Sequence, residues 1–202
     1  TICTADLTDD EIQEGLNLLL IGDSIAVDVT DDFYEIFPNS VSDTKIGRIT
    51  SLGKQVLDSY IDEKKWEGEG VIFASLSNSP INGELEDIRE KIGKDMPLFL
   101  TTVRIPHDTF EDESNSKIKK FVEENDHTYL IDWYAASEGH DEYFDADDTH
   151  LLSAGAKAYA KCIKEAILDA YKKENIEIPK SRLSSGTDTS KVSSNDSSTD
   201  TS

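Results

Sequence analysis

The chain has 202 residues and carries 42 Asp and Glu against 20 Lys and Arg, a net charge of −22 with a sequence pI of about 4.4. This length fits one domain of roughly 100–200 residues, with or without a tail. A surface this acidic repels phosphate backbones, which excludes nucleic-acid binding, and it also excludes polybasic docking on membranes. No stretch of the sequence approaches the ~18 apolar residues of a membrane span.

The composition changes at residue 180. Thirteen of the 23 residues from 180 to 202 are Ser or Thr, and three basic residues balance three acidic ones. Such a segment has too few apolar side chains to offset the entropy of ordering, so we expect a disordered tail. The whole net charge then belongs to residues 1–179, and we expect one folded domain over residues 16–179.

The N-terminal segment, residues 1–15, is expected to be a linker. It contains no basic and apolar signal peptide, so a secreted protein would be represented here in a mature or excised form. Cys3 and Cys162 lie far apart in the chain and form no CxxC pair. They are either bridged or two unrelated thiols, and both alternatives stay open.

Short apolar runs alternate with amphipathic stretches along the rest of the chain, which is typical of an α/β fold. Strands are expected at residues 18–21, 42–46, 71–74, 98–103 and 129–131. Helices are expected at residues 50–63, 81–92, 114–124 and 153–173. We predict a three-layer α/β/α sandwich with a five-stranded, mostly parallel, flavodoxin-like sheet. In such sheets the ligand site lies at the carboxyl ends of the strands.

The first expected strand runs directly into Gly22-Asp23-Ser24. A serine at this point lies at the carboxyl edge of the sheet, and Gly22 permits a tight turn there. If a helix follows, the Ser24 N–H is free to donate to a ligand. The alternative is a plain turn, because Asp and Ser are common helix N-caps.

A second motif, Asp147-Asp148-Thr149-His150, precedes the last expected helix. A serine nucleophile needs a base to accept its proton, and the base needs a carboxylate that holds its tautomer. Asp147 and His150 are three residues apart, so both side chains can face the same way. The alternative is an acidic loop with a surface histidine. The other histidines lack this combination of a carboxylate at −3 and a following helix; they are His107, His127 and His140.

A third motif, Ser77-Asn78-Ser79-Pro80, follows the third expected strand. An Asn side chain at this edge can donate to an oxyanion, and loss of such a donor costs ~10²–10³ in rate. Asn is also a common turn residue, which is the structural alternative.

The order of these three motifs resembles the SGNH/GDSL hydrolase superfamily. The resemblance is greater to the extracellular catalytic domain of peptidoglycan O-acetyltransferases, which follows a membrane acyltransferase domain, and it covers about residues 16–170. The stretches that carry it are Leu19-Leu20-Ile21-Gly22-Asp23-Ser24, Phe37-Pro38-Asn39, Lys45-Ile46-Gly47-Arg48, Val103-Arg104-Ile105-Pro106, Ile131-Asp132-Trp133-Tyr134-Ala135-Ala136-Ser137, Asp148-Thr149-His150-Leu151 and Gly155-Ala156-Lys157-Ala158-Tyr159-Ala160.

The resemblance implies a role for each matching residue. Ser24 would be the nucleophile, His150 the general base and then acid, and Asp147 the residue that orients His150. The Ser24 amide, the Asn78 side chain and Gly47 would form the oxyanion hole. The family usually has Gly-Thr-Asn-Gly around the Asn, where this chain has Leu76-Ser77-Asn78-Ser79.

The function implied is acetyl transfer through an acyl-Ser24 intermediate to the C6 hydroxyl of N-acetylmuramic acid in peptidoglycan. The membrane acyltransferase domain would relay the acetyl group, and the reaction would take place at the extracellular face of the membrane. Three alternatives remain open: a carbohydrate acetylesterase, a catalytically impaired glycan-binding module and a flavin binder of similar architecture.

Three further residues are candidates for substrate binding. Arg48 and Arg104 are rare cations at the ends of expected strands, where they contact either an anionic ligand or the many carboxylates. Trp133 either lines a sugar-binding cleft or packs in the core. We expect no metal and no other cofactor, because the sequence has neither an HxxxH motif nor a Cys/His cluster.

Overall fold

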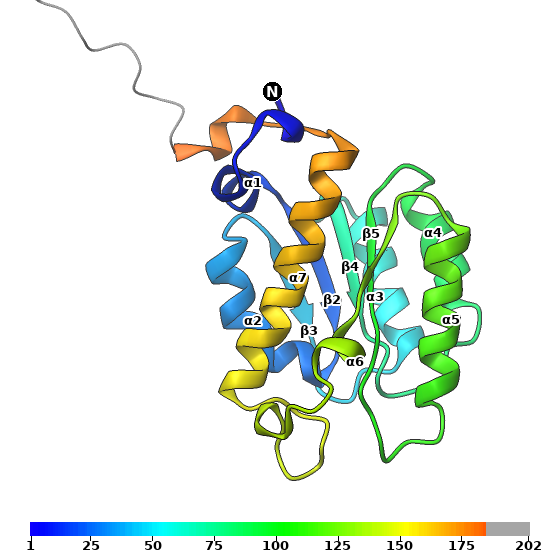
Figure 1. The fold of residues 1–202 in the computed structure, drawn as a ribbon. Helices are drawn as coiled ribbons and strands as arrows, with labels where there is room; N and C mark the ends of the chain where they lie inside the picture. The colour runs from blue at the N-terminus through cyan, green and yellow to red at the C-terminus, as the bar shows by residue number, and fades with distance from the viewer. Residues whose placement is uncertain (185–202) are drawn as a thin grey trace, which may run out of the picture.

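The computed structural model describes residues 1–184 and confirms the predicted three-layer sandwich (Figure 1). The central sheet has the strand order β3-β2-β4-β5-β6, and each neighbouring pair is parallel. Its strands are β2 (Leu18–Gly22), β3 (Val41–Thr44), β4 (Gly70–Ala74), β5 (Leu98–Thr101) and β6 (Thr128–Ile131).

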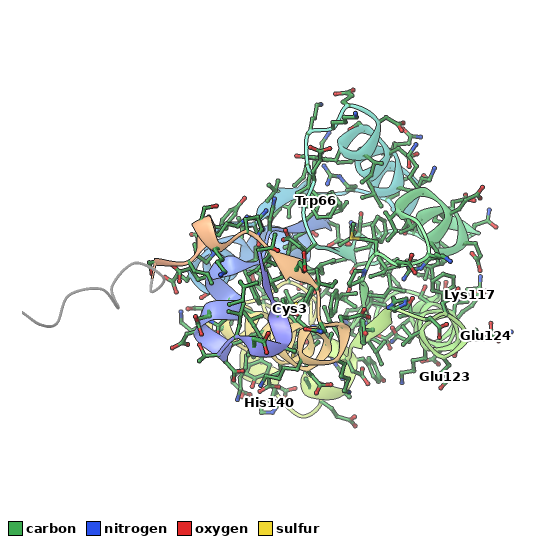
Figure 2. All side chains as sticks on the ribbon, turned by 90° about the horizontal axis from the view of Figure 1, so that it is seen from above. Cys3, Trp66, Lys117, Glu123, Glu124 and His140 are labelled. Atoms are coloured by element: carbon green, nitrogen blue, oxygen red, sulfur yellow. The ribbon has the colours of Figure 1, made fainter. Side chains whose placement is uncertain are left out.

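Helices cover both faces of this sheet. One face packs against α2 (Ser24–Ile36) and α7 (Ser153–Glu174), and the other packs against α3 (Thr50–Asp62), α4 (Glu84–Ile92) and α5 (Glu111–Glu124). In Figure 2, which views the layers from above, Glu123 and Glu124 lie on the outer side of α5. No helix in residues 1–184 is both long enough and apolar enough to cross a bilayer.

Alternate residues of the strands enter two separate cores. Leu18 and Leu20 of β2 pack with α2 and α7, whereas Leu19 and Ile21 pack with α3 and α4. Successive side chains of a strand point to opposite faces, so a strand buried on both sides must be apolar throughout. This is why the continuous apolar runs in the sequence mark the strands.

Two helices begin three residues away from the predicted start, and the ends of α3 and α7 differ from the prediction by one residue. Helix α4 begins at Glu84 instead of residue 81, because Gly83 adopts a left-handed conformation (φ 83°) at the N-cap. Helix α5 begins at Glu111 instead of residue 114. Its first turn holds Glu111, Asp112 and Glu113, which suit the positive end of the helix dipole.

The N-terminal segment is folded, in contrast to the expected linker. Strand β1 (Ile2–Cys3) pairs antiparallel with β7 (Glu177–Ile178), and η1 (Thr4–Asp6) leads into α1 (Asp9–Gly15). Thr8 and Glu11 form a reciprocal capping box at the start of α1. The motif Thr8-Asp9-Asp10-Glu11 is a recognisable sequence signal for such a cap.

The start of the expected tail is also part of the fold. Helix η3 (Lys180–Arg182) precedes Leu183, which is buried in the core that includes α1 and α7. Residues 185–202 of the expected tail lie outside the described part of the chain. Cys3 and Cys162 are both free thiols.

Candidate active site

Ser24 lies at the junction of β2 and α2. It is the first residue of α2, and Asp23 caps the helix by accepting a hydrogen bond from the Ile25 N–H at 3.1 Å. Gly22 is required by the close approach of α2, since a Cβ at this position would lie 2.2 Å from Ala26 Cβ. Ser24 is therefore held at the carboxyl edge of the sheet by strand β2, by the turn at Gly22 and by the Asp23 cap of α2.

Ser24, His150 and Asp147 are joined in one chain of hydrogen bonds. Ser24 Oγ lies 2.9 Å from His150 Nε2, and His150 Nδ1 contacts Asp147 Oδ2. The other Asp147 oxygen accepts from the backbone N–H groups of Thr149, at 3.0 Å, and His150, at 2.9 Å. An ionised carboxylate only accepts, which assigns the proton to Nδ1 and leaves Nε2 to accept from the serine hydroxyl.

The charges of the three groups follow from these contacts. Hydrogen bonding to His150 lowers the pKa of Asp147 to about 2, so Asp147 is ionised at neutral pH. The same hydrogen bond raises the pKa of His150, and the nearby carboxylates of Asp28 and Asp23 add to this effect. The site is thus arranged to stabilise a positively charged imidazolium.

The loop that carries His150 is held by its own backbone and by α2. Asp145 N–H donates to the His150 carbonyl at 2.9 Å, and Asp148 adopts a left-handed conformation (φ 58°) that bends the chain between Asp147 and His150. Leu151 N–H donates to the Asp28 carboxylate of α2 at 3.1 Å. Asp28 was not foreseen from the sequence, although its place one helical turn after Ser24 is a signal that it faces the same loop.

The three predicted oxyanion donors follow three adjacent strands, β3, β2 and β4. The Ser24 N–H lies in the first turn of α2, where backbone donors have no partner within the helix. Asn78 Nδ2 donates to the Arg48 carbonyl at 3.1 Å, which uses one of its two hydrogens. Gly47 has a φ of 75°, and within residues 1–184 nothing except its chain neighbours lies within 4 Å of the position of a Cβ.

A cavity of about 380 Å³ opens beside Gly47, between the loop after β3 and helix α3. Apolar and polar side chains line it together: Lys45, Ile46, Gly47, Arg48, Leu52, Gln55, Val56 and Ser59.

The substrate-binding prediction is wrong for Trp133. Its side chain is 2% exposed and packs against the rings of Tyr143, Phe144 and Tyr159. Trp133 begins the short helix α6 (Trp133–Ala136), whose first residue faces the α7 core. Trp133 therefore packs in the core and does not line a sugar-binding cleft.

Arg48 and Arg104, the two arginines predicted to bind substrate, both form hydrogen bonds within the protein. Arg48 is buried, and its guanidinium donates to the carbonyls of Gly22 and Asp43 and to the Asp43 carboxylate. Arg104 donates to the Ser137 hydroxyl and the Tyr134 carbonyl and lies 4.2 Å from the centre of the Tyr134 ring. Arg48 thus pairs with a carboxylate of the protein, as the alternative to ligand binding predicted. Arg104 instead contacts neutral oxygens.

Asp23 is the main residue that sequence reasoning missed at this site, since the motif suggested only a helix cap. It is fully buried, and its second oxygen accepts from the Ser77 N–H at 3.0 Å. Burial raises the pKa of Asp23 to about 6, against the opposite effect of these hydrogen bonds. For metals, residues 1–184 contain no group of three or more His, Cys, Asp or Glu side chains that could hold an ion.

Comparisons with known proteins agree with this geometry. No protein-family profile matches the sequence. The chain is 34% identical over 146 residues to the O-acetyltransferase OatA of Staphylococcus aureus, a match that covers 72% of this chain and 24% of the relative. It therefore spans about a quarter of the length of the curated relatives it matches.

Solved structures match over most of the domain. The C-terminal catalytic domain of Streptococcus pneumoniae peptidoglycan O-acetyltransferase A matches with a TM-score of 0.71 and 20% identity, over 81% of this chain and 97% of that one. A GDSL-like lipase from Bacteroides thetaiotaomicron matches with a TM-score of 0.63 and 16% identity, over 83% of this chain and 94% of the lipase chain. The chain is thus a homologue of the OatA O-acetyltransferases over 146 residues, and it has the fold of the SGNH/GDSL hydrolases.

Proposed function

We propose that this domain is a serine-dependent O-acetyltransferase that acts on peptidoglycan through an acyl-Ser24 intermediate. The observation that carries the proposal is the hydrogen-bonded series Ser24–His150–Asp147 at the carboxyl edge of the sheet. The similarity to OatA supports the acetyl group and the glycan acceptor as substrates.

The first half of the reaction forms the acyl-enzyme. His150 Nε2 accepts the Ser24 proton as Oγ attacks the carbonyl carbon of the acetyl donor. The Ser24 N–H, the Asn78 side chain and the Gly47 N–H stabilise the negative oxygen of the tetrahedral intermediate. As the intermediate collapses, the donor oxygen leaves and takes the proton from His150, while Asp147 stays ionised.

The second half reverses these steps with a new alcohol. The muramic acid hydroxyl gives its proton to His150 and attacks the acetyl carbonyl. The Ser24 oxygen then leaves and recovers the proton. We propose that a membrane acyltransferase domain of a longer protein supplies the acetyl group at the extracellular face of the membrane, in keeping with the greater length of the relatives.

Hydrolysis is the second candidate reaction, and the exposure of the site favours it when no acceptor is present. The side chains of His150 and Asp147 are 44% and 49% exposed, so water can reach the acyl-enzyme. The same residues would then act as a carbohydrate acetylesterase.

The test is to give the chain an acetyl ester donor with and without a glycan acceptor. We expect acetylated glycan from the wild-type chain and at least ~10³-fold slower turnover from Ser24→Ala. Ser114→Ala is a matched control, because Ser114 is buried on α5 and its hydroxyl has no hydrogen-bond partner among residues 1–184. Hydrolysis without any transfer would reject the transferase in favour of the esterase. Full activity of Ser24→Ala would reject both.

A further inference from the structure

The Asp23 carboxylate connects two loops of the proposed site. Its Oδ1 accepts from the Ile25 N–H, one residue after Ser24, and its Oδ2 accepts from the Ser77 N–H, one residue before Asn78. Within residues 1–184, this carboxylate is the direct polar link between residues 23–25 and residues 77–79.

Capping alone does not account for a buried carboxylate at this position. Asp23 has no solvent exposure and no cation within ion-pair distance among the described residues, and its burial disfavours the ionised form. In the described part of the chain, the N-cap residues of helices α4 and α7 make no side-chain hydrogen bond, so such a bond is not needed at every helix start of this fold. A serine hydroxyl would cap α2 equally well without placing a charge in the interior.

The other contacts of the Asn78 loop lead to a different neighbour. Asn78 Nδ2 donates to the Arg48 carbonyl, and Ser79 Oγ accepts from the Thr50 N–H at 3.0 Å. These bonds fix the Asn78 loop relative to the loop that contains Gly47. The hydrogen bond from the Ser77 N–H to Asp23 is its direct polar contact with residues 23–25.

We propose that Asp23 is a positioning residue for acyl transfer, which holds the Ser24 N–H and the Asn78 side chain at the spacing that an oxyanion requires. This inference rests on the proposed function of Ser24 and Asn78. The charge of Asp23 has a second effect, because it favours the imidazolium that forms when His150 takes the serine proton. Asp147 of the same loop and Asp28 of α2 act on His150 in the same direction, and Tyr159 of α7 also faces Asp23.

The decisive variant is Asp23→Ser. A serine keeps an oxygen that caps the Ile25 N–H, but it is too short to hold Ser77 and carries no charge. With p-nitrophenyl acetate as substrate, we expect kcat to fall ~10–100-fold with KM within about twofold of wild type. The rising limb of the pH–rate profile should move to lower pH, because removal of the negative charge lowers the pKa of His150.

Asp132→Ser is the matched control. Asp132 caps α6 at the same edge of the sheet, where its carboxylate accepts from the Ala135 N–H and the Thr102 hydroxyl. We expect this variant to keep the wild-type kcat and pH profile. Circular dichroism and thermal unfolding of both variants report whether they fold.

Each remaining outcome overturns the inference. Wild-type kcat in Asp23→Ser would show that Asp23 only caps α2. A lower kcat with an unmoved pH limb, or failure of Asp23→Ser to fold while Asp132→Ser folds, would show a purely structural role. Failure of the wild-type chain to cleave the ester would instead reject the proposed function, and the inference with it.

Discussion

The two ring nitrogens of His150 are held by residues of different kinds. Nδ1 faces a carboxylate that stays ionised down to a pH of about 2, and Nε2 faces the Ser24 hydroxyl. This arrangement leaves Nε2 free to accept the proton of the Ser24 hydroxyl. The orientation of the ring therefore depends on Asp147 as much as on the fold of its loop.

Asp147→Asn is expected to lower kcat by ~10³–10⁴, because an amide can also hold the wrong tautomer of His150. The wild-type rate should rise with pH as His150 loses its proton, with a midpoint above the ordinary value of about 6.5. In the variant this midpoint should fall, since the carboxylate that raises the His150 pKa is gone. Initial rates of ester hydrolysis across about pH 5 to 9 measure both effects.

Asp145→Asn is the control for that experiment. It changes a carboxylate of the same loop whose hydrogen bond, within the described residues 1–184, comes from the neighbouring Ala146 N–H. It should keep the wild-type rate and midpoint. A wild-type midpoint well below the ordinary histidine value would contradict the proposed hydrogen bond between Asp147 and His150.

Single residues were predictable where a motif defines their chemistry. Ser24, Asp147 and His150 could be proposed because nucleophile, base and carboxylate occur at the ends of expected elements. The partners of Arg48 and Trp133 could not, because Gly22, Asp43 and Tyr159 approach them only in the folded chain. Asp23 shows the same limit, since Ser77 is 54 residues away in sequence.

At the scale of elements, α1 and the β1–β7 pair form a structural unit at the end of the sheet opposite α6 (Figure 1). Ile12 of α1 is fully buried in the core that includes α7. The segment therefore adds apolar contacts to the domain without reaching Ser24. Its capping box was readable from the sequence, but seven residues of helix without a long apolar run gave too weak a periodicity to predict α1.

Thr8→Ala is expected to lower the free energy of unfolding by about 1 kcal/mol, because the Glu11 N–H loses its capping oxygen. Chemical denaturation measures the change, and kcat should stay at the wild-type value. Thr8→Ser keeps the hydroxyl and should restore most of the stability. A fall in kcat without a change in stability would contradict the separation of this segment from the site.

At the scale of the whole molecule, the sheet order and the acidic surface act together. Adjacent strands β3, β2 and β4 bring the loops of Gly47, Ser24 and Asn78 to one edge. The alternation of strands and helices predicted the sheet and a site at its carboxyl ends, whereas the family resemblance supplied the expected donors. The net charge of −22 surrounds that edge with a negative field. An anionic glycan must then bind through short-range contacts.

Added salt should therefore strengthen the binding of an anionic glycan acceptor. Raising the ionic strength from about 10 mM to 150 mM shortens the screening length from about 30 Å to 8 Å and should lower KM for an anionic peptidoglycan fragment several-fold. Turnover of the neutral ester p-nitrophenyl acetate serves as the control and should not change. An increase of KM with salt would instead indicate a local cationic contact that attracts the glycan.

The open space around Gly47 leads to a last consequence. Apart from its two chain neighbours, no residue of 1–184 lies within 4 Å of a Cβ at this position, so the described residues leave room for a side chain. Its φ of 75° nevertheless belongs to a region that L-residues enter at a cost of about 1–2 kcal/mol. A D-alanine would fit the same backbone freely, whereas an L-alanine of equal size would strain it. Chirality, rather than space, therefore restricts this turn. Any L-residue that replaces Gly47 must adopt the unfavourable positive φ, whatever the size of its side chain.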